Sequence, residues 1–267
     1  MMKKRNKLSR ISKMHFWKLG FRSALFLLAT GLYIYDRLTG GGEHFDHLIK
    51  NPWFLLMILV IFSVEMILRF FPSKLESMGC QKQFKQNFTP TEEKIPELPA
   101  WWRTFISAAA WFALNGVFFA LYYLHILDNG IMLLIALAYS VCDMICILFF
   151  CPFQTWFLGN KCCTSCRIYN WDYAMMFTPL LVVKHFVAWT LLGIALLLLI
   201  RWEVTFRLYP ERFSERTNAC LSCKNCKERL CQHKKQLRGF LKKNKDRFTL
   251  LGNRAMETVR SKRKENK

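Results

Sequence analysis

Acidic side chains are scarce in this chain, and its first 22 residues contain none. The 267 residues include 18 Asp and Glu against 39 Lys and Arg, and the first 22 positions alone hold eight basic residues. Basic residues beside apolar segments are typical of a cytoplasmic flank that faces anionic lipid. Nucleic acid is not an expected partner, because a basic terminus beside membrane-length apolar segments more often marks a lipid-facing flank.

The sequence also shows no internal repeat, and no small-x-small cleavage site follows its first apolar segment. A secretory signal peptide ends at such a site, whereas this segment continues into Tyr33-Ile-Tyr-Asp-Arg. We therefore expect residues 16–35 to remain in the protein, either as a membrane span or as a helix in the membrane interface.

Apolar residues, in contrast, are abundant and come in long blocks. Hydrophobic residues make up 53% of the chain, and the blocks of roughly 20 residues match the length of a helix that crosses a bilayer. The candidate spans are residues 16–35, 53–71, 104–127, 131–150 and 172–200. The sequence therefore predicts an all-α, polytopic integral membrane protein with four to five transmembrane helices and a short, basic, cysteine-rich C-terminal tail.

The expected organisation has three parts. A basic segment covers residues 1–22, a transmembrane helix bundle covers 16–200 and includes a cysteine-rich loop at 151–171, and a basic tail covers 201–267. Asp128-Asn-Gly predicts a tight turn that makes the third and fourth spans an antiparallel hairpin. In the tail, leucines and phenylalanines near one face of a basic helix predict binding to anionic lipid headgroups, although a solvated tail fits the same pattern.

Two orientations in the cell membrane stay open. With five spans, the basic loops place the N-terminus inside and the tail outside. If residues 16–35 do not cross, four spans remain, and both termini are cytoplasmic. We favour the second arrangement, because the free thiols of the tail belong in a reducing compartment.

Polar residues fall at one depth in four of the predicted spans. Ionisable groups inside a membrane are costly and indicate either a function or an interhelical contact. These residues are Glu65, Asn115, Asp143, Lys184 and His185. We expect Lys184 to pair with Asp143 or Glu65. The group predicts a proton path, a substrate or ion pocket, or a quinone headgroup site, or alternatively ion pairs that fix helix rotation.

Four cysteines within twelve residues give the most specific pattern in the chain: Cys220, Cys223, Cys226 and Cys231. The x2-x2 spacing partly resembles the run that holds an iron–sulfur cluster in bacterial ferredoxins. The last gap is four rather than three residues, however, and Gln232 replaces the proline of that run. An iron–sulfur cluster, zinc, and thiols without metal therefore all stay open.

A second, looser set contains Cys151, Cys162, Cys163 and Cys166. It is either a second metal or redox site, or a group of neighbouring thiols. Cys163 and Cys166 form a CxxC pair ahead of a predicted helix, whose N-terminus would stabilise a thiolate, so these two are the catalytic candidates. The pair resembles, in spacing and span number only, the membrane oxidoreductases that pass disulfide electrons to quinones.

The leading functional prediction is a multi-pass membrane protein for redox or electron transfer, acting with a membrane redox partner. Electrons would pass between a metal centre in the tail and an acceptor near Asp143, Lys184 and His185. The alternatives are a non-enzymatic scaffold or sensor with zinc-binding cysteines, and a small proton-coupled transporter. Whether the protein is an enzyme stays open.

Overall fold

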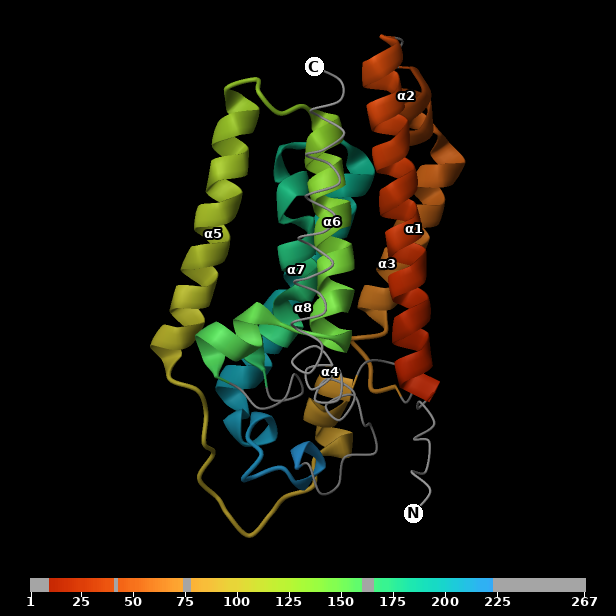
Figure 1. Cartoon of the computed structure of the whole chain (residues 1–267). Coiled ribbons are helices and arrows are strands. Elements are labelled where there is room, and N and C mark those ends of the chain that lie inside the picture. The colour runs from red at the N-terminus through yellow and green to blue at the C-terminus, as the bar shows by residue number, and fades with distance from the viewer. Residues whose placement is uncertain (1–9, 41–42, 74–77, 160–165, 223–267) are drawn as a thin grey trace, which may run out of the picture. The chain divides into compact units, whose positions relative to one another are not determined.

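The computed structural model describes residues 10–40, 43–73, 78–159 and 166–222, and in these ranges the chain is helical (Figure 1). The long helices are α1 (Arg10–Thr39), α3 (Pro52–Ile67), α5 (Trp101–Tyr123), α6 (Asn129–Leu148) and α8 (Phe186–Leu208). The short ones are α2 (Glu43–Lys50), α4 (Met78–Gln83) and α7 (Asp172–Phe177). Within the described residues, β-pairing is limited to an isolated bridge between Pro90 and Asn218. The predicted all-α class is therefore confirmed.

Three helices, α5, α6 and α8, are long and apolar enough to cross a membrane. A fourth candidate is the pair α2–α3, which bends by 58° between residues 50 and 52. Asn51 accepts hydrogen bonds from the backbone N–H groups of Trp53 and Phe54, so α3 begins as a new, capped helix. The predicted spans 104–127 and 131–150 correspond closely to α5 and α6, which are joined as a hairpin (Figure 1).

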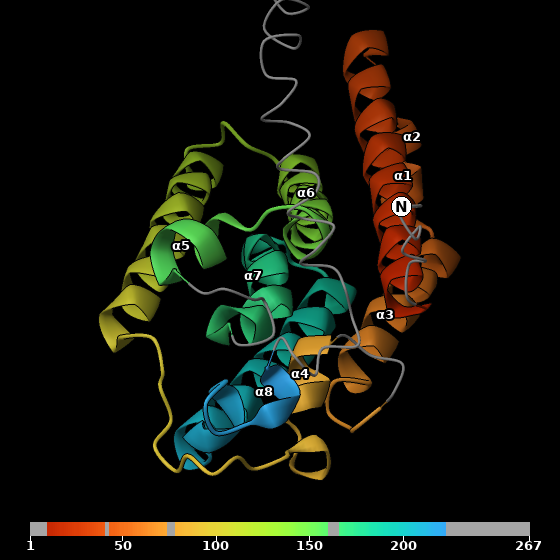
Figure 2. The same cartoon turned by 60° about the horizontal axis from the view of Figure 1, so that its bottom comes forward.

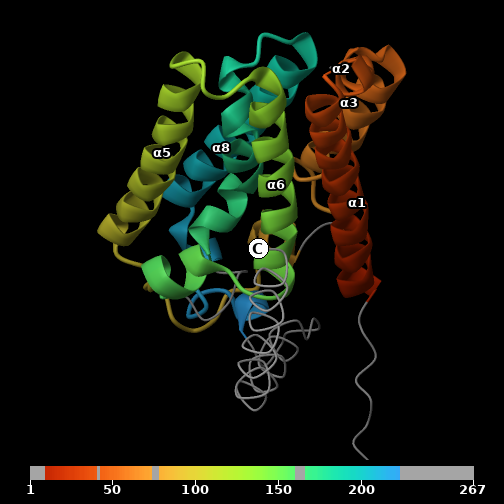
Figure 3. The ribbon, with the colours of Figure 1, turned by 45° about the horizontal axis from the view of Figure 1, so that its top comes forward.

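Helix α1 is longer than the predicted segment 16–35. Its 30 residues extend about 45 Å, and it packs along α6 (Figure 3). Lys18 and Arg22 interrupt its apolar sequence, and α1 is not among the described helices that are apolar enough to span on composition alone. The two cations nevertheless lie at a helix interface, because both reach Glu65 of α3.

The predicted fifth span, residues 172–200, is not one helix. A 3₁₀ turn, η4 (Arg167–Trp171), leads into α7, which is followed by a second 3₁₀ turn, η5 (Thr178–Val182), and an extended connection. Pro179 lies in the first turn of η5, where a residue without a backbone N–H is tolerated. Inside an α-helix a proline removes a hydrogen bond and clashes with the preceding turn, so α7 does not continue through this position. The apolar span therefore begins only at Phe186, where the His185 side chain accepts a hydrogen bond from the backbone N–H of Val187.

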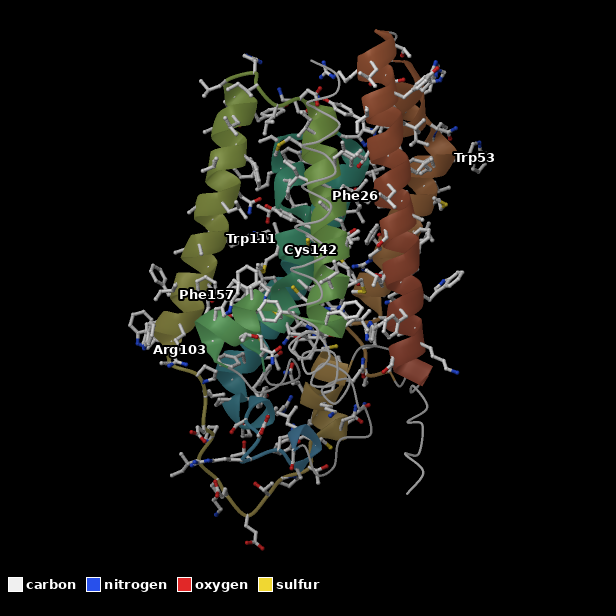
Figure 4. All side chains as sticks on the ribbon, viewed as in Figure 1. Phe26, Trp53, Arg103, Trp111, Cys142 and Phe157 are labelled. Atoms are coloured by element: carbon white, nitrogen blue, oxygen red, sulfur yellow. The ribbon has the colours of Figure 1, made fainter. Side chains whose placement is uncertain are left out.

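The main core lies where α3, α7 and α8 meet. Phe62 and Met66 of α3 pack with Phe177 of α7, and α8 contributes Leu198 and Trp202. Away from the core, large apolar side chains are exposed, including Trp53 at 76% and Phe112 at 69% (Figure 4). Soluble monomers rarely expose so much apolar surface, so this outer surface fits contact with lipid.

The first part of the predicted tail belongs to the folded body. Helix α8 continues to Leu208, and the segment after it runs beside the loop between α4 and α5 (Figure 2). The backbone N–H of Ala219 donates to the Thr89 carbonyl at 2.8 Å, and the buried Asn218 side chain donates to the Lys82 and Arg212 carbonyls. Residues 209–222 therefore pack against the loop that leads to α5.

Candidate functional site

A charge cluster centred on Arg22 joins three helices. The guanidinium of Arg22, only 1% exposed, lies 2.6 Å from Glu65 Oε2 on α3 and 3.1 Å from Asp143 Oδ2 on α6. It also donates to the Ser140 carbonyl at 3.1 Å and lies over the Phe62 ring. Arg22 thus neutralises charge on two acids that come from different helices.

Further partners surround the same acids. Lys18 Nζ lies 3.4 Å from Glu65 Oε1, and the Tyr173 hydroxyl of α7 donates to Glu65 Oε2 at 2.8 Å. Just beyond the end of α3, Arg69 pairs with Asp172 at 2.6 Å and lies over the Tyr173 ring. These contacts tie α1, α3, α6 and α7 together through ion pairs that are largely removed from solvent.

The sequence analysis placed Glu65 and Asp143 in one group, and the structure brings them together through Arg22. Lys184, which we expected to pair with them, instead lies with His185 in the extended connection before α8, and both are exposed. The reason is the break after η5, which removes these residues from the middle of a helix. Asn115 lies elsewhere on α5, where it donates to the Trp111 carbonyl at 2.9 Å and accepts from the Tyr139 hydroxyl at 3.5 Å.

A cavity of about 110 Å³ lies beside the charge cluster, between α5, α6 and α7. Its wall shares Asp143 and Asp172 with the cluster. Most of the remaining wall consists of aromatic and sulfur-containing side chains. The aromatic ones are Trp111, Tyr139, Phe153 and Tyr169, and the sulfur-containing ones are Cys142, Cys146, Cys151, Cys166, Met175 and Met176.

Two of these cysteines are hydrogen-bonded to each other. Cys146 lies in the last turn of α6, and its thiol contacts the thiol of Cys151, just beyond the helix. The backbone N–H of Gln154 donates to Cys151 Sγ at 3.4 Å, as the chain turns back into the helical turn η2 (Phe153–Leu158). The two sulfur atoms are therefore held side by side at the edge of an apolar cavity.

The position of η2 fixes the cavity wall. Arg103 of α5 donates to the Leu158 carbonyl at 3.2 Å, which ties η2 to α5 (Figure 4). Phe153 packs edge-on against Trp111, with ring centroids 6.1 Å apart, and Trp111 lies 4.5 Å from the Tyr139 ring. The cavity is thus closed on this side by a cluster of tilted and edge-on aromatic rings from α5, α6 and η2.

The predicted cysteine sites are covered only in part. Cys151 and Cys166 both line the cavity, whereas Cys162 and Cys163 lie outside the described residues. Of the tail cluster, only Cys220 is described, and its sulfur lies 3.2 Å from the Thr89 hydroxyl. In the ranges that the structure describes, no three His, Cys, Asp or Glu side chains are arranged to hold a metal ion.

Sequence reasoning missed three residues that matter here. Arg22 falls in the basic N-terminal segment, and Cys142 and Cys146 fall inside an apolar block, where a cysteine is typical of packing. The sequence does contain one signal for Arg22. Glu65 and Asp143 are two acids at one predicted depth, but Lys184 was the single basic residue expected to pair with them. The pairing of Cys146 with Cys151 depends on the turn of the chain at Pro152, and the sequence spacing does not predict this turn. No family model, curated protein or solved structure matches this chain.

Proposed function

We propose that this is a membrane thiol-redox protein in which Cys146 and Cys151 cycle between two thiols and a disulfide. The observation that carries the proposal is the hydrogen bond between these two thiols at the wall of an apolar cavity. A disulfide requires close approach of the two side chains, and these two thiols share a hydrogen bond and one cavity wall. The pair therefore differs from Cys80, which is fully buried and does not line the cavity.

The chemistry is a two-electron step. Forming the disulfide joins the two sulfur atoms and releases two protons and two electrons, which pass to an acceptor. Cys142 and Cys166 line the same cavity and are candidates for exchange with the pair, because a thiolate attacks a disulfide through a mixed disulfide. CxxC chemistry at Cys163 and Cys166, which we predicted from the sequence, would then pass electrons to or from this pair.

The charge cluster has a supporting role in this proposal. Each charged end of Arg22, Glu65 and Asp143 has an oppositely charged partner within 3.1 Å. Charged groups that are paired in this way fix the rotation of the helices that carry them. The cluster therefore positions α6, and with it Cys146, rather than carrying an ion or a substrate.

The membrane placement is also a proposal. We infer that α5, α6, α8 and the bent pair α2–α3 cross the cell membrane, with α1 alongside them and the tail in the cytoplasm. The exposed apolar side chains and helix lengths support the spans, and the basic tail supports its side of the membrane. The tail would bind anionic lipid headgroups.

A metal centre at Cys220, Cys223, Cys226 and Cys231 remains a separate proposal, supported by the sequence spacing alone. Iron and zinc analysis of anaerobically purified protein tests it. One equivalent of either metal, lost in the Cys223→Ser variant, supports the centre. Its absence removes the tail as a redox partner but leaves the Cys146–Cys151 pair untouched.

Differential alkylation with peptide mass spectrometry tests the dithiol proposal. The full-length protein in nanodiscs is treated with a mild dithiol oxidant, acid-quenched and labelled. We expect an intramolecular Cys146–Cys151 disulfide to form before any other modification. Cys80→Ala is the matched control, because it removes a buried thiol that does not line the cavity and should leave the disulfide intact. If Cys146 stays reduced as long as the buried Cys80 does, the proposal is overturned.

A further inference from the structure

A second pocket lies where the end of α1, the start of α2 and the start of α6 meet. Gly40, with a φ of 70°, follows the last residue of α1, and α2 packs against α1. The pocket has a volume of about 350 Å³, a size suited to a small ligand. Figure 1 shows α2 at the end of the helices opposite the segment 209–222. In the proposed arrangement this is the non-cytoplasmic surface of the membrane.

Aromatic and acidic side chains form the wall of this pocket. The rings of Tyr33 and Phe45 pack edge to face, with centroids 5.4 Å apart. The acidic lining residues are Asp36, Asp46 and Asp128. Among the described residues that line the pocket, Arg37 is the single basic one, so the wall carries an excess of negative charge. Such a wall attracts cations and repels anions.

The three carboxylates differ in their partners. Asp128 accepts a hydrogen bond from Arg37, and Asp46 lies 2.8 Å from Lys50 Nζ. Asp36 is only 5% exposed, and its Oδ2 accepts from a backbone N–H of α2 at 2.6 Å. Its Oδ1 is buried without a hydrogen-bond partner in the part of the chain that the structure describes. Because an unsatisfied buried acceptor is costly, Asp36 is the lining residue that gains most from a donor in the pocket.

We propose that this pocket binds a primary ammonium group at Asp36, with the apolar part of the ligand against the Tyr33 and Phe45 rings. An ammonium group carries three N–H donors and a positive charge, so it supplies the donor that Oδ1 lacks and suits the charge of the wall. A metal ion needs several such ligands, and among the described residues no three His, Cys, Asp or Glu side chains are arranged to hold one. The site is independent of the dithiol proposal.

Two sources of the ammonium group reach this position. Arg37 and Asp46 in the wall are exposed, so a free amine enters from water. Leu38, two residues after Asp36 on α1, is 82% exposed and fits contact with lipid. The head group of an ethanolamine phospholipid therefore reaches the pocket from the bilayer surface.

Equilibrium dialysis of the full-length protein with radiolabelled phenethylamine tests binding of the free amine. We expect saturable binding, and binding of the neutral analogue N-acetylphenethylamine that is weaker by about tenfold or more, because the amide carries no charge. Asp36→Asn keeps an acceptor for the N–H of α2 but loses the charge, so the affinity for the amine should fall by about tenfold or more. Asp46→Asn is the matched control. It makes the same change of charge in an exposed residue that is already paired with Lys50, and the affinity should change by less than about threefold.

Native mass spectrometry distinguishes the two sources. The protein is released from nanodiscs that contain equal amounts of phosphatidylethanolamine and phosphatidylcholine. Selective retention of phosphatidylethanolamine by the wild type, but not by Asp36→Asn, assigns the site to a lipid head group. Saturable amine binding without such retention assigns it to a free amine.

Two results overturn the site. One is equal binding of the amine and its neutral analogue together with no selective retention of the ethanolamine lipid. This comparison uses the wild-type protein and so holds even if Asp36→Asn does not fold. The other is a folded Asp36→Asn variant that binds the amine and retains the lipid as well as the wild type does.

Discussion

The charge cluster and the cavity are neighbouring regions that share Asp143 and Asp172. They differ in whether their side chains can still form new bonds. In the charge cluster, Arg22 is 1% exposed and bridges Glu65 and Asp143, so these charges are paired with one another inside the protein. In the cavity, the Cys146–Cys151 thiols line open space and can still change their bonds. Ionisable residues inside a membrane are costly enough to suggest a function, yet in our proposal this cluster only holds the helices in place.

The difference between the regions has a physical cause. A buried ion pair is stable only when each charge keeps its partner, so such a cluster tolerates little change. A thiol pair is neutral and small, and it costs little to bury. In the proposed function, the reactive thiols lie where burial is inexpensive, and the strong electrostatic contacts hold the helices that carry them. The following variants perturb each region separately, beginning with the largest expected effect on stability.

Removing the central cation should have the largest effect. Arg22→Met leaves Glu65 and Asp143 buried without their shared partner, and we expect a loss of about 3–5 kcal/mol in the free energy of unfolding. Unfolding in detergent, followed by circular dichroism, measures it. The compensated triple variant Arg22→Met, Glu65→Gln, Asp143→Asn should recover much of the loss. Failure of the triple variant to recover would show that Arg22 packing, not its charge, holds the helices.

Removing one neutral donor from the same cluster should cost less. Tyr173→Phe deletes the 2.8 Å hydrogen bond to Glu65 but keeps the ring against Arg69. A hydrogen bond to a charged group contributes about 1.5–3 kcal/mol, so we expect a loss in that range. The same unfolding measurement applies, and Tyr169→Phe is the control, because its ring also lies under Arg69 but no bond to Glu65 is involved.

In the cavity we expect a small effect on stability and a large effect on redox chemistry. Cys146→Ala should change the free energy of unfolding by less than about 1 kcal/mol, because it removes a single sulfur atom. It should nevertheless abolish disulfide formation, measured by alkylation and mass spectrometry of the purified protein. A variant that unfolds as readily as Arg22→Met would contradict the distinction between a structural cluster and a reactive cavity.

The smallest effect is expected outside both regions, at the start of α6. Burial alone would raise the pKa of Asp128, but hydrogen bonds from the Ile131 N–H and the Tyr33 hydroxyl, together with the Arg37 charge, lower it below its ordinary value. A lowered pKa stabilises the fold at neutral pH, and this contribution is lost as the pH falls through the ordinary value of 3.8 and then through the lower folded one. Asp128→Asn should therefore cost about 0.5 kcal/mol at neutral pH and less at low pH, because exposed ion pairs contribute little. Unfolding of both proteins at the two pH values measures the difference.

The sequence alone predicted the parts of the fold that depend on uninterrupted apolar blocks. Residues 104–127 and 131–150 contain no Asp, Glu, Lys or Arg except Asp143, and they correspond closely to α5 and α6. The block 172–200 looked the same by hydropathy. Hydropathy does not register the break around Pro179, where the chain changes from helix to 3₁₀ turn to extended backbone.

The site was predicted only in part, because some of its residues do not stand out in the sequence. Glu65 and Asp143 were found because acids inside apolar segments are rare. Arg22 was missed because it follows a run of basic residues and so resembled the end of a lipid-facing flank. The hydrogen bond between Cys146 and Cys151 depends on how the chain turns after α6, and spacing alone does not reveal this geometry.

A redox titration of the Cys146–Cys151 pair tests the central claim most directly. Full-length protein is equilibrated in glutathione buffers of graded potential, and the oxidised fraction of the two cysteines is read by alkylation and mass spectrometry. We expect one two-electron transition, with a tenfold change in ratio per about 30 mV and a midpoint within about −120 to −270 mV, the range of thiol oxidoreductases. A pair that stays reduced in the most oxidising buffer, while the protein remains folded, would contradict the proposal.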